Sequence, residues 1–289
     1  MVKKYMLILK HLGKNMKFRQ EDLDRIHRIQ LEMLIEVDRI CRKYNIKYII
    51  SGGTLLGAVR NGKFIPWDDD IDVRMDRAEY IKFTAVCGKE LDKDRFFFQD
   101  HNTDPNYPWY YGKMRYNHSH YTRVGQEHLD MHDGIFIDIM PADGLPNNTF
   151  IRHVVIMKCF VLKKFLYSAV GSACERNGFV KTVYRLMNLV PKRYIFKKLD
   201  KISERYMSPK YGDVTSYSFV ACGQKQFTKR EWHFDCVEIP FEGISVLAPR
   251  AYHEWLSMTY GDDYMTPPPV KDQVGHNEIS RFSIEEVER

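Results

Sequence analysis

The residues best suited to catalysis lie between positions 51 and 75. Asp70 and Asp72 are two residues apart at the start of a predicted strand, and alternate residues of a strand point to the same face. Two carboxylates on one face repel each other, and burying them without a counter-charge is costly. A divalent cation would offset that cost, and oxygen ligands favour Mg²⁺ or Mn²⁺. The spacing therefore predicts a metal site held by Asp70 and Asp72.

Paired glycines precede these acids and follow a predicted strand at 48–50. A backbone without Cβ atoms can come close to a phosphate group, and the first N–H groups of the short helix that follows have no partners within that helix. For either motif alone, a glycine turn and a solvated acidic loop is the simpler interpretation. Both motifs in this order, with Trp67 beside the acids, indicate chemistry on a phosphate with a metal ion. We expect Gly52, Gly53 and Thr54 to bind substrate.

A third acid, Asp138, interrupts an apolar stretch at 134–141 that predicts a buried strand. A carboxylate in such surroundings needs a partner, because a buried unpaired charge is expensive. A place in the same metal site, beside Asp70 and Asp72, would supply that partner. A salt bridge to a neighbouring arginine is the alternative, since structural ion pairs also place acids in strands.

Several segments resemble the signature of the LicD family of phosphotransferases. The first is Gly53-Thr54-Leu55-Leu56-Gly57-Ala58-Val59-Arg60, and the second is Phe64-Ile65-Pro66-Trp67-Asp68-Asp69-Asp70-Ile71-Asp72. Near the C-terminus, 260–268 resembles the family pattern of a helix that ends in Tyr-Gly and leads to paired prolines. This family includes bacterial phosphocholine transferases and fukutin-related proteins, and it belongs to the nucleotidyltransferase superfamily.

The resemblance implies an α/β (α+β) fold of the nucleotidyltransferase type, with a small mixed sheet flanked by helices. It implies that Asp70, Asp72 and Asp138 are the catalytic acids, that Arg60 lies in the substrate site, and that Lys113 meets the donor phosphate. The expected reaction is Mg²⁺-dependent transfer of phosphocholine from CDP-choline to a hydroxyl of a cell-surface glycan or teichoic acid precursor. We expect this glycan acceptor to be lipid-linked.

Three other functions stay open. The donor could carry ribitol phosphate or glycerol phosphate on its CDP group. The same acids could serve nucleotidylyl transfer, which leaves the nucleotide on the acceptor. An inactive nucleotide-binding protein of the same fold is the non-enzymatic alternative, which the presence of all three acids disfavours. We expect no nucleic acid partner.

An aromatic run at 107–111 could select the donor alcohol. A trimethylammonium group donates no conventional hydrogen bond, so a protein binds it with aromatic faces, each contributing roughly 0.5 to 2 kcal/mol. Trp109 and Tyr111 share a face if this run is a strand, which makes them candidates for a choline cage. Ordinary packing in the core is the alternative.

Helices and strands must position these residues. Apolar residues three and four apart predict a helix over 21–43, and Asp76 to Glu79 fits a capping box that begins a helix ending near Leu91. We expect strands at 96–99, 109–116 and 121–124, a hairpin at 240–249 and a helix at 250–260. The predicted organisation is a catalytic core at 1–149, a basic helical subdomain at 150–207 and the rest of the catalytic domain at 208–289.

Composition limits the location and partners of the protein. The 289 residues are 44% hydrophobic, enough for a substantial core, and the six scattered cysteines with no signal peptide favour reduced thiols in a cytoplasmic protein. Thirteen Lys or Arg residues and only three acids lie between Arg152 and Arg205, although the net charge is +6. This subdomain could face an anionic membrane at its inner surface, or be a solvated helical face. The lysines of 154–170 do not share one helical face, and residues 1–19 are too short and too charged to span a bilayer.

Overall fold

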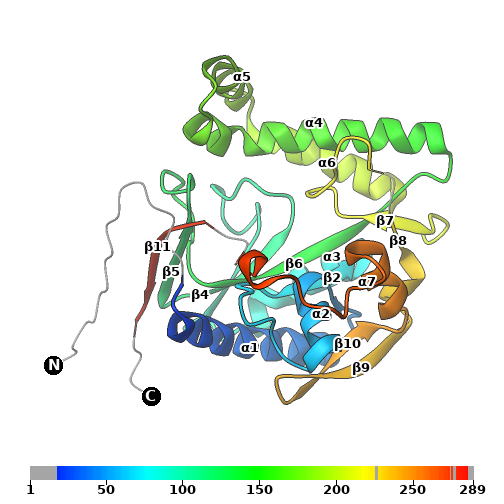
Figure 1. Ribbon diagram of the computed structural model, residues 1–289. Coiled ribbons are helices and arrows are strands. Elements are labelled where there is room, and N and C mark those ends of the chain that lie inside the picture. The colour runs from blue at the N-terminus through cyan, green and yellow to red at the C-terminus, as the bar shows by residue number, and fades with distance from the viewer. Residues whose placement is uncertain (1–17, 225–226, 274, 276–277, 286–289) are drawn as a thin grey trace.

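The centre of the molecule is a mixed sheet covered by helices (Figure 1). The computed structural model describes residues 18–224, 227–273, 275 and 278–285. Its central strands lie in the order β1 (Ile49–Ile50), β2 (Asp72–Asp76), β6 (Phe136–Gly144), β4 (Gly112–Tyr116) and β3 (Phe96–Gln99). Strands β2 and β6 are parallel, and their other neighbours pair in antiparallel fashion. The α/β fold predicted from the sequence is confirmed.

Helices α1 (Gln20–Lys43) and α3 (Arg77–Glu90) contact the sheet. Buried apolar residues of α1 recur at helical spacing, among them Ile26, Met33 and Val37, and they pack into the main core. Asp76 ends β2 and begins α3, because its carboxylate accepts a hydrogen bond from the N–H of Ala78 at 3.1 Å. Both helices therefore pack against strands of the sheet.

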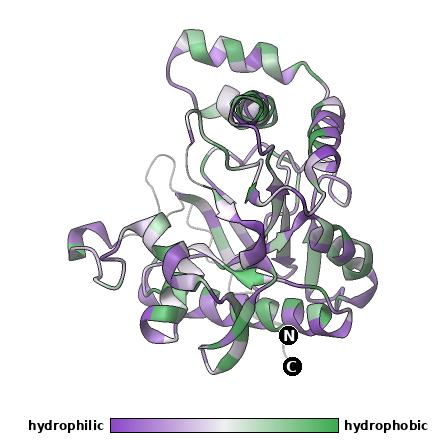
Figure 2. Ribbon diagram, turned by 90° about the vertical axis from the view of Figure 1, so that its right-hand side faces the viewer, coloured by the Kyte–Doolittle hydropathy of each residue, from purple (hydrophilic) through white to green (hydrophobic). Residues whose placement is uncertain are grey.

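A helical layer lies over the other side of the molecule and consists of α4 (Thr149–Cys174), α5 (Gly178–Asn188) and α6 (Lys192–Tyr206) (Figures 1 and 2). It has a second apolar cluster of its own, which includes Ile156, Leu199 and Tyr217. A buried carboxylate on β6, that of Asp143, connects this layer to the sheet. Arg77 donates to both carboxylate oxygens of Asp143 at 2.6 and 2.9 Å, and the hydroxyl of Ser203 on α6 donates to the same carboxylate at 2.9 Å.

The remaining elements complete the edges of the molecule. They are β5 (Ser119–Arg123) paired with β11 (Ile279–Ile284), the hairpin β9 (Cys236–Phe241) and β10 (Ile244–Pro249), α7 (Tyr252–Tyr260), the short strands β7 (Asp213–Thr215) and β8 (Thr228–Lys229), and the 3-10 turns η1 (Arg230–His233) and η2 (Val270–Asp272). The predicted helix at 250–260 begins two residues later, because Pro249 still pairs with Cys236 in the hairpin.

Two predicted strands begin later than expected. Asp70 lies before β2 rather than in it, because α2 (Gly52–Asn61) leads the chain away after β1 and leaves no partner strand on that side. The alternation argument that places Asp70 and Asp72 on one strand face is therefore wrong. Residues 109–111 also precede their strand, since the pairing of β3 with β4 ends at Gln99 and Lys113.

All six cysteines lie in the described part of the chain and are free thiols there. We find no helix among the described residues with both the length and the low polarity needed to cross a membrane. Of the N-terminal segment 1–19, residues 1–17 lie outside the described residues.

Candidate active site

Three charged side chains form a row across the middle of the sheet. Asp72 on β2 is in register with Asp138 on β6, which in turn is in register with Lys113 on β4. The ammonium of Lys113 forms a buried ion pair with Asp138 Oδ1. It also lies 3.4 Å from the ring centroid of Phe136. Asp138 therefore has a basic partner, which is a lysine rather than the arginine suggested from the sequence. It also lies beside Asp72, as predicted.

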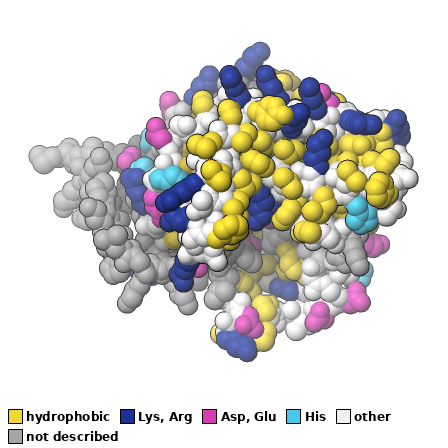
Figure 3. All heavy atoms as spheres, turned by 90° about the horizontal axis from the view of Figure 1, so that it is seen from above, with side chains coloured by type: hydrophobic (Ala, Val, Ile, Leu, Met, Phe, Trp, Pro, Cys, Tyr) yellow, Lys and Arg dark blue, Asp and Glu magenta, His cyan; other side chains and the backbone are white. Residues whose placement is uncertain are grey.

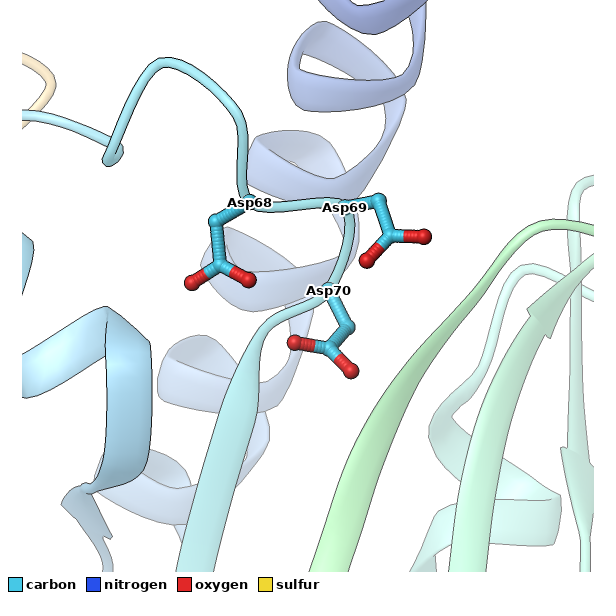
Figure 4. A group of neighbouring side chains, drawn as sticks. All are labelled: Asp68, Asp69 and Asp70. Carbon is cyan, nitrogen blue, oxygen red and sulfur yellow. The ribbon is translucent and has the colours of Figure 1, made fainter. Parts of the chain in front are cut away.

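A second group of acids lies on the bend just before β2 (Figure 4). Asp68, Asp69 and Asp70 each offer a carboxylate oxygen, and these oxygens lie within 4.8 Å of one another. Asp68 and Asp69 are buried, and Asp70 is half-buried. Asp69 is held in place because Tyr121 donates to its Oδ2 and Gln30 donates to its backbone oxygen at 2.8 Å.

The acids raise one another's pKa. Burial first, and then the charges of Asp70 and Asp69, raise the pKa of Asp68 to about 8. Burial and the charge of Asp138 raise the pKa of Asp70 to about 6, and burial with the charges of Asp70 and Asp138 raises the pKa of Asp72 well above its usual value. Arg123 opposes this only weakly, because its Nη2 lies 4.0 Å from Asp70 Oδ2. Without a cation, the buried acids therefore hold protons to a higher pH than free carboxyl groups do.

The glycines are needed because the acids lie against the backbone. A Cβ at Gly52 would overlap Asp72 Oδ2, and a Cβ at Gly53 would overlap Asp68 Oδ2. Gly52 also has a φ of +55°, in the left-handed region that favours glycine. The hydroxyl of Thr54 accepts a hydrogen bond from the N–H of Asp72 at 2.9 Å. Gly52, Gly53 and Thr54, which were predicted to bind substrate, therefore lie directly against Asp72 and Asp68.

The other predicted substrate residues lie in several different parts of the fold. Arg60 donates to the backbone oxygens of Tyr264, at 2.6 Å from Nε, and Thr266, at 3.2 Å from Nη2, and so holds the C-terminal segment. Trp67 packs against the main core. Trp109 and Tyr111 line a cavity of about 260 Å³, and the ammonium of Lys113 lies 5.3 Å from the Tyr111 ring centroid.

Four residues at or near the acid cluster were not predicted as site residues from the sequence. Asp68 and Asp69 lie in the motif but were not assigned to the site. Arg74 follows Asp72 by two residues, a spacing that could have identified it, and both line a cavity of about 320 Å³. Burial lowers the pKa of Arg74 to about 10, and its Nε has no hydrogen-bond partner among the described residues. Desolvation and the charges of Asp72, Asp68 and Asp70 raise the pKa of Tyr260, which ends α7, so this tyrosine lies near the acids; no sequence signal pointed to it.

The acid cluster fits a divalent metal. Its ligand atoms are all carboxylate oxygens, the donor type that Mg²⁺ and Mn²⁺ prefer. Asp69 Oδ1 is buried and has no hydrogen-bond partner among the described residues, and the raised pKa values show that the acids lack sufficient counter-charge. Asp68, Asp69 and Asp70 would hold the metal, with Asp72 and Asp138 beside them.

We expect Asp68→Asn to stabilise the metal-free protein increasingly as the pH rises. The folded-state pKa of about 8 exceeds the ordinary value of 3.8, so between about pH 4 and pH 8 the folded protein binds more protons at this site than the unfolded chain. Stability from this group is therefore lost as the pH rises through that window, and asparagine does not ionise. The advantage should grow by on the order of 2 kcal/mol between pH 6 and pH 8.

Thermal unfolding of both proteins with a chelator checks this prediction. Titrating groups away from the site are common to both proteins and cancel in the difference. A difference in melting temperature that does not change with pH would show that Asp68 is ionised normally in the folded state.

The paired glycines, the acids before and at the start of β2, and Asp138 on β6 are arranged around one site on the mixed sheet. Residues 45–163 match the family model of the LicD/FKTN/FKRP nucleotidyltransferase domain. This segment contains β1, α2, β2 and β6, and with them every acid of the site.

Comparison with curated proteins gives a relative that covers most of the chain. The lipopolysaccharide cholinephosphotransferase LicD of Haemophilus influenzae is 29% identical over 255 residues, or 86% of this chain and 92% of that protein. An uncharacterized protein of Rickettsia typhi is 40% identical over 55 residues, 19% of this chain and 18% of its own length. One from Rickettsia prowazekii is 26% identical over 141 residues, 48% of this chain and 47% of its own. Residues 45–163 thus match a LicD-type nucleotidyltransferase domain, and most of the chain is similar to a LicD phosphotransferase.

Proposed function

We propose that this protein transfers phosphocholine from CDP-choline to a hydroxyl of a cell-surface glycan, with Mg²⁺ or Mn²⁺ as cofactor. The observation that carries the proposal is the cluster of Asp68, Asp69 and Asp70, beside the paired positions Asp72 and Asp138, within a segment that matches the LicD domain. A group of acids with raised pKa values beside a cavity suits a metal-assisted reaction on a pyrophosphate. The relationship to a lipopolysaccharide cholinephosphotransferase supports choline as the donor alcohol.

The reaction needs one bond to form and one to break. The acceptor oxygen bonds to the phosphorus that carries choline, the bond from that phosphorus to the bridging oxygen breaks, and CMP leaves. A bound divalent metal would offset charge on the pyrophosphate. Arg74 lines the cavity beside Asp72, and its guanidinium, whose Nε has no hydrogen-bond partner among the described residues, can donate to a phosphate oxygen there. A carboxylate of the site accepts the proton of the acceptor hydroxyl.

The choline cage stays a prediction. Trp109 and Tyr111 line one cavity together with the aromatic rings of Tyr167 and Phe219. Arg123, Lys163 and Lys164 line the same cavity, and no acid does. Like charges would repel a trimethylammonium group there, whereas a phosphate would be attracted, so the cavity suits the anionic part of a substrate at least as well as choline.

We also propose that the acceptor is a lipid-linked glycan, such as a lipopolysaccharide or teichoic acid precursor, and that the enzyme works at the inner face of the membrane. The Haemophilus relative is named for its action on lipopolysaccharide, a glycan carried on a lipid. The excess of basic residues between Arg152 and Arg205 supports a position near anionic lipid.

A panel of CDP-alcohols tests the proposed donor. We expect CMP release from CDP-choline with Mg²⁺, little release from CDP-ribitol or CDP-glycerol, and none with a chelator. The mass of the acceptor should increase by one phosphocholine group. Running lipopolysaccharide and teichoic acid precursors side by side identifies the acceptor class.

Each alternative has its own signature in this panel. Release of CMP from CDP-ribitol or CDP-glycerol alone would reject choline and keep metal-dependent phosphotransfer. An acceptor that gains CMP would indicate nucleotidylyl transfer. Binding of a CDP-alcohol without any turnover would indicate an inactive binding protein.

A further inference from the structure

The outer face of the helical layer has many exposed hydrophobic side chains. Phe150, Val154, Met157 and Val161 follow one another at spacings of three and four along α4 and form an exposed stripe, with exposed fractions from 41% to 77%. The buried residues of α4, such as Val155, Ile156 and Cys159, lie on the opposite side of the helix. The stripe is therefore not part of the core of this chain.

Helix α5 extends this hydrophobic surface. None of its described residues is buried, and it lies at the outermost edge of the molecule (Figure 2). Phe179, Leu186 and, directly after the helix, Leu189 are 79%, 62% and 78% exposed. Tyr184 packs the other side of α5 onto α4, where its ring contacts Tyr167 and would meet a Cβ at Gly171. The large apolar side chains are thus left facing outward.

Basic residues surround and interrupt these apolar side chains (Figure 3). Exposed cations of the layer include Lys158, Arg176, Arg185, Arg193, Lys197 and Lys201. Not every lysine faces outward, because Lys163 donates to the backbone oxygen of Val220 and Lys192 donates to Ser168 Oγ at 2.6 Å. This explains why the lysines of α4 do not lie on one face of the helix. Lys163 bonds to the interior of the layer, whereas Lys158 is exposed beside the apolar stripe.

We propose that the α4–α5 face, defined as Phe150, Val154, Met157, Val161, Phe179, Leu186 and Leu189 with the basic residues around them, docks onto a bilayer that contains anionic lipid. Apolar side chains enter the boundary between headgroups and acyl chains, and the cations contact anionic headgroups. A second copy of the chain fits less well, since two faces with this excess of positive charge repel each other and lysine is depleted in protein interfaces. A nucleic acid would use the charges and leave the apolar stripe in water.

The inference rests on the proposed function, because it gives a surface to the membrane contact that this function requires. Helix α4 carries the apolar stripe outward, while its Lys163, Lys164 and Tyr167 line the cavity that also contains Arg123 and Tyr111. Docking through α4 would therefore place this cavity close to the lipid surface, from which a lipid-linked acceptor can reach the acids.

Vesicle sedimentation with the full chain and no nucleotide tests the proposal independently of catalysis. Phosphatidylcholine vesicles are compared with vesicles that also contain phosphatidylglycerol, at low and high salt. We expect binding to the anionic vesicles that falls as salt rises. The triple variant Lys158→Gln, Arg176→Gln, Arg185→Gln should weaken it about fivefold for each charge removed. The variant Phe179→Ser, Leu186→Ser, Leu189→Ser should weaken it by on the order of tenfold for each side chain.

The matched control is Ile81→Ser with Lys89→Gln on α3, where Ile81 is 48% exposed and Lys89 is exposed as well. It should bind vesicles like the parent, and all variants should keep the parent's melting temperature because the altered side chains are exposed. Equal binding to neutral and anionic vesicles would overturn the proposal. So would parental binding by both triple variants, or a dimer in solution that the apolar variant dissociates. Loss of CMP release without any change in vesicle binding would reject the proposed reaction and leave the docking surface intact.

Discussion

Asp72→Asn should reduce the rate of CMP release by at least about a thousandfold and leave the fold intact. The carboxylate is half-buried at the start of β2, in register with Asp138 and beside the cavity that contains Arg74. Asparagine keeps its size and its backbone hydrogen bond to Thr54, but removes a negative charge from the metal site. Electrostatic contributions of this kind are often the largest in catalysis, about 3 to 4 kcal/mol for one group.

The same substitution should not destabilise the metal-free protein. Burial, and then the charges of Asp70 and Asp138, raise the pKa of Asp72, so an uncharged side chain of the same size favours the folded state. Steady-state kinetics and thermal unfolding, each with and without Mg²⁺, measure both effects. Asp24→Asn, at an exposed position on α1, is the matched control and should behave like the parent. Activity within tenfold of the parent, with metal still bound, would remove Asp72 from the proposed site.

Gly52→Ala should lower the rate by about a hundredfold or more, although this residue has no functional group. Its φ of +55° costs a residue with a Cβ roughly 1 to 2 kcal/mol. In addition, the new Cβ would overlap Asp72 Oδ2, so the carboxylate must move away from the site. Misplacement of a reacting group by about 1 Å can cost a hundredfold in rate.

Gly62→Ala separates the two effects. Gly62 has a φ of +65°, but the nearest atom to an added Cβ is the backbone oxygen of Pro240 at 3.8 Å. This variant should lose the same roughly 1 to 2 kcal/mol of stability and keep its activity. The measurements are melting temperature and CMP release for both variants. Equal loss of activity in the two would mean that backbone strain alone, rather than contact with Asp72, explains the effect of Gly52→Ala.

Local sequence patterns were sufficient for the class of fold and for the centre of the site. Periodicity predicted α1 and the hairpin of β9 and β10, and the order of strand, glycines, helix and acidic strand predicted how β1, α2 and β2 follow one another. These features depend on residues close together in the chain, whose spacing is visible in the sequence. The motif at 53–72 lies within the residues that match the LicD domain.

Pairings between distant segments were decided by the tertiary structure. The sequence could not show that β4 lies antiparallel to β6 and so brings Lys113 to Asp138, because the register between strands depends on the packing of the whole sheet. It also could not show that the chain bends at Asp68 to Asp70. The chain leaves β1 for α2 at Gly52, so the residues before β2 have no β1 partner there and form a bend instead of a strand. For the same reason Tyr260, far along the chain from Asp68, Asp70 and Asp72, is near them only once α7 has packed.

The helical layer shows the same division. Its helices and its excess of positive charge are properties of the sequence. Which apolar residues enter the core was decided by the packing of α4 against α6 and of α5 against α4, because a helix with apolar residues on several sides can bury only the side that meets a neighbour. Ile156 and Cys159 of α4 met that neighbour and are buried, whereas Val154 and Met157, equally apolar and only a few residues away, face outward.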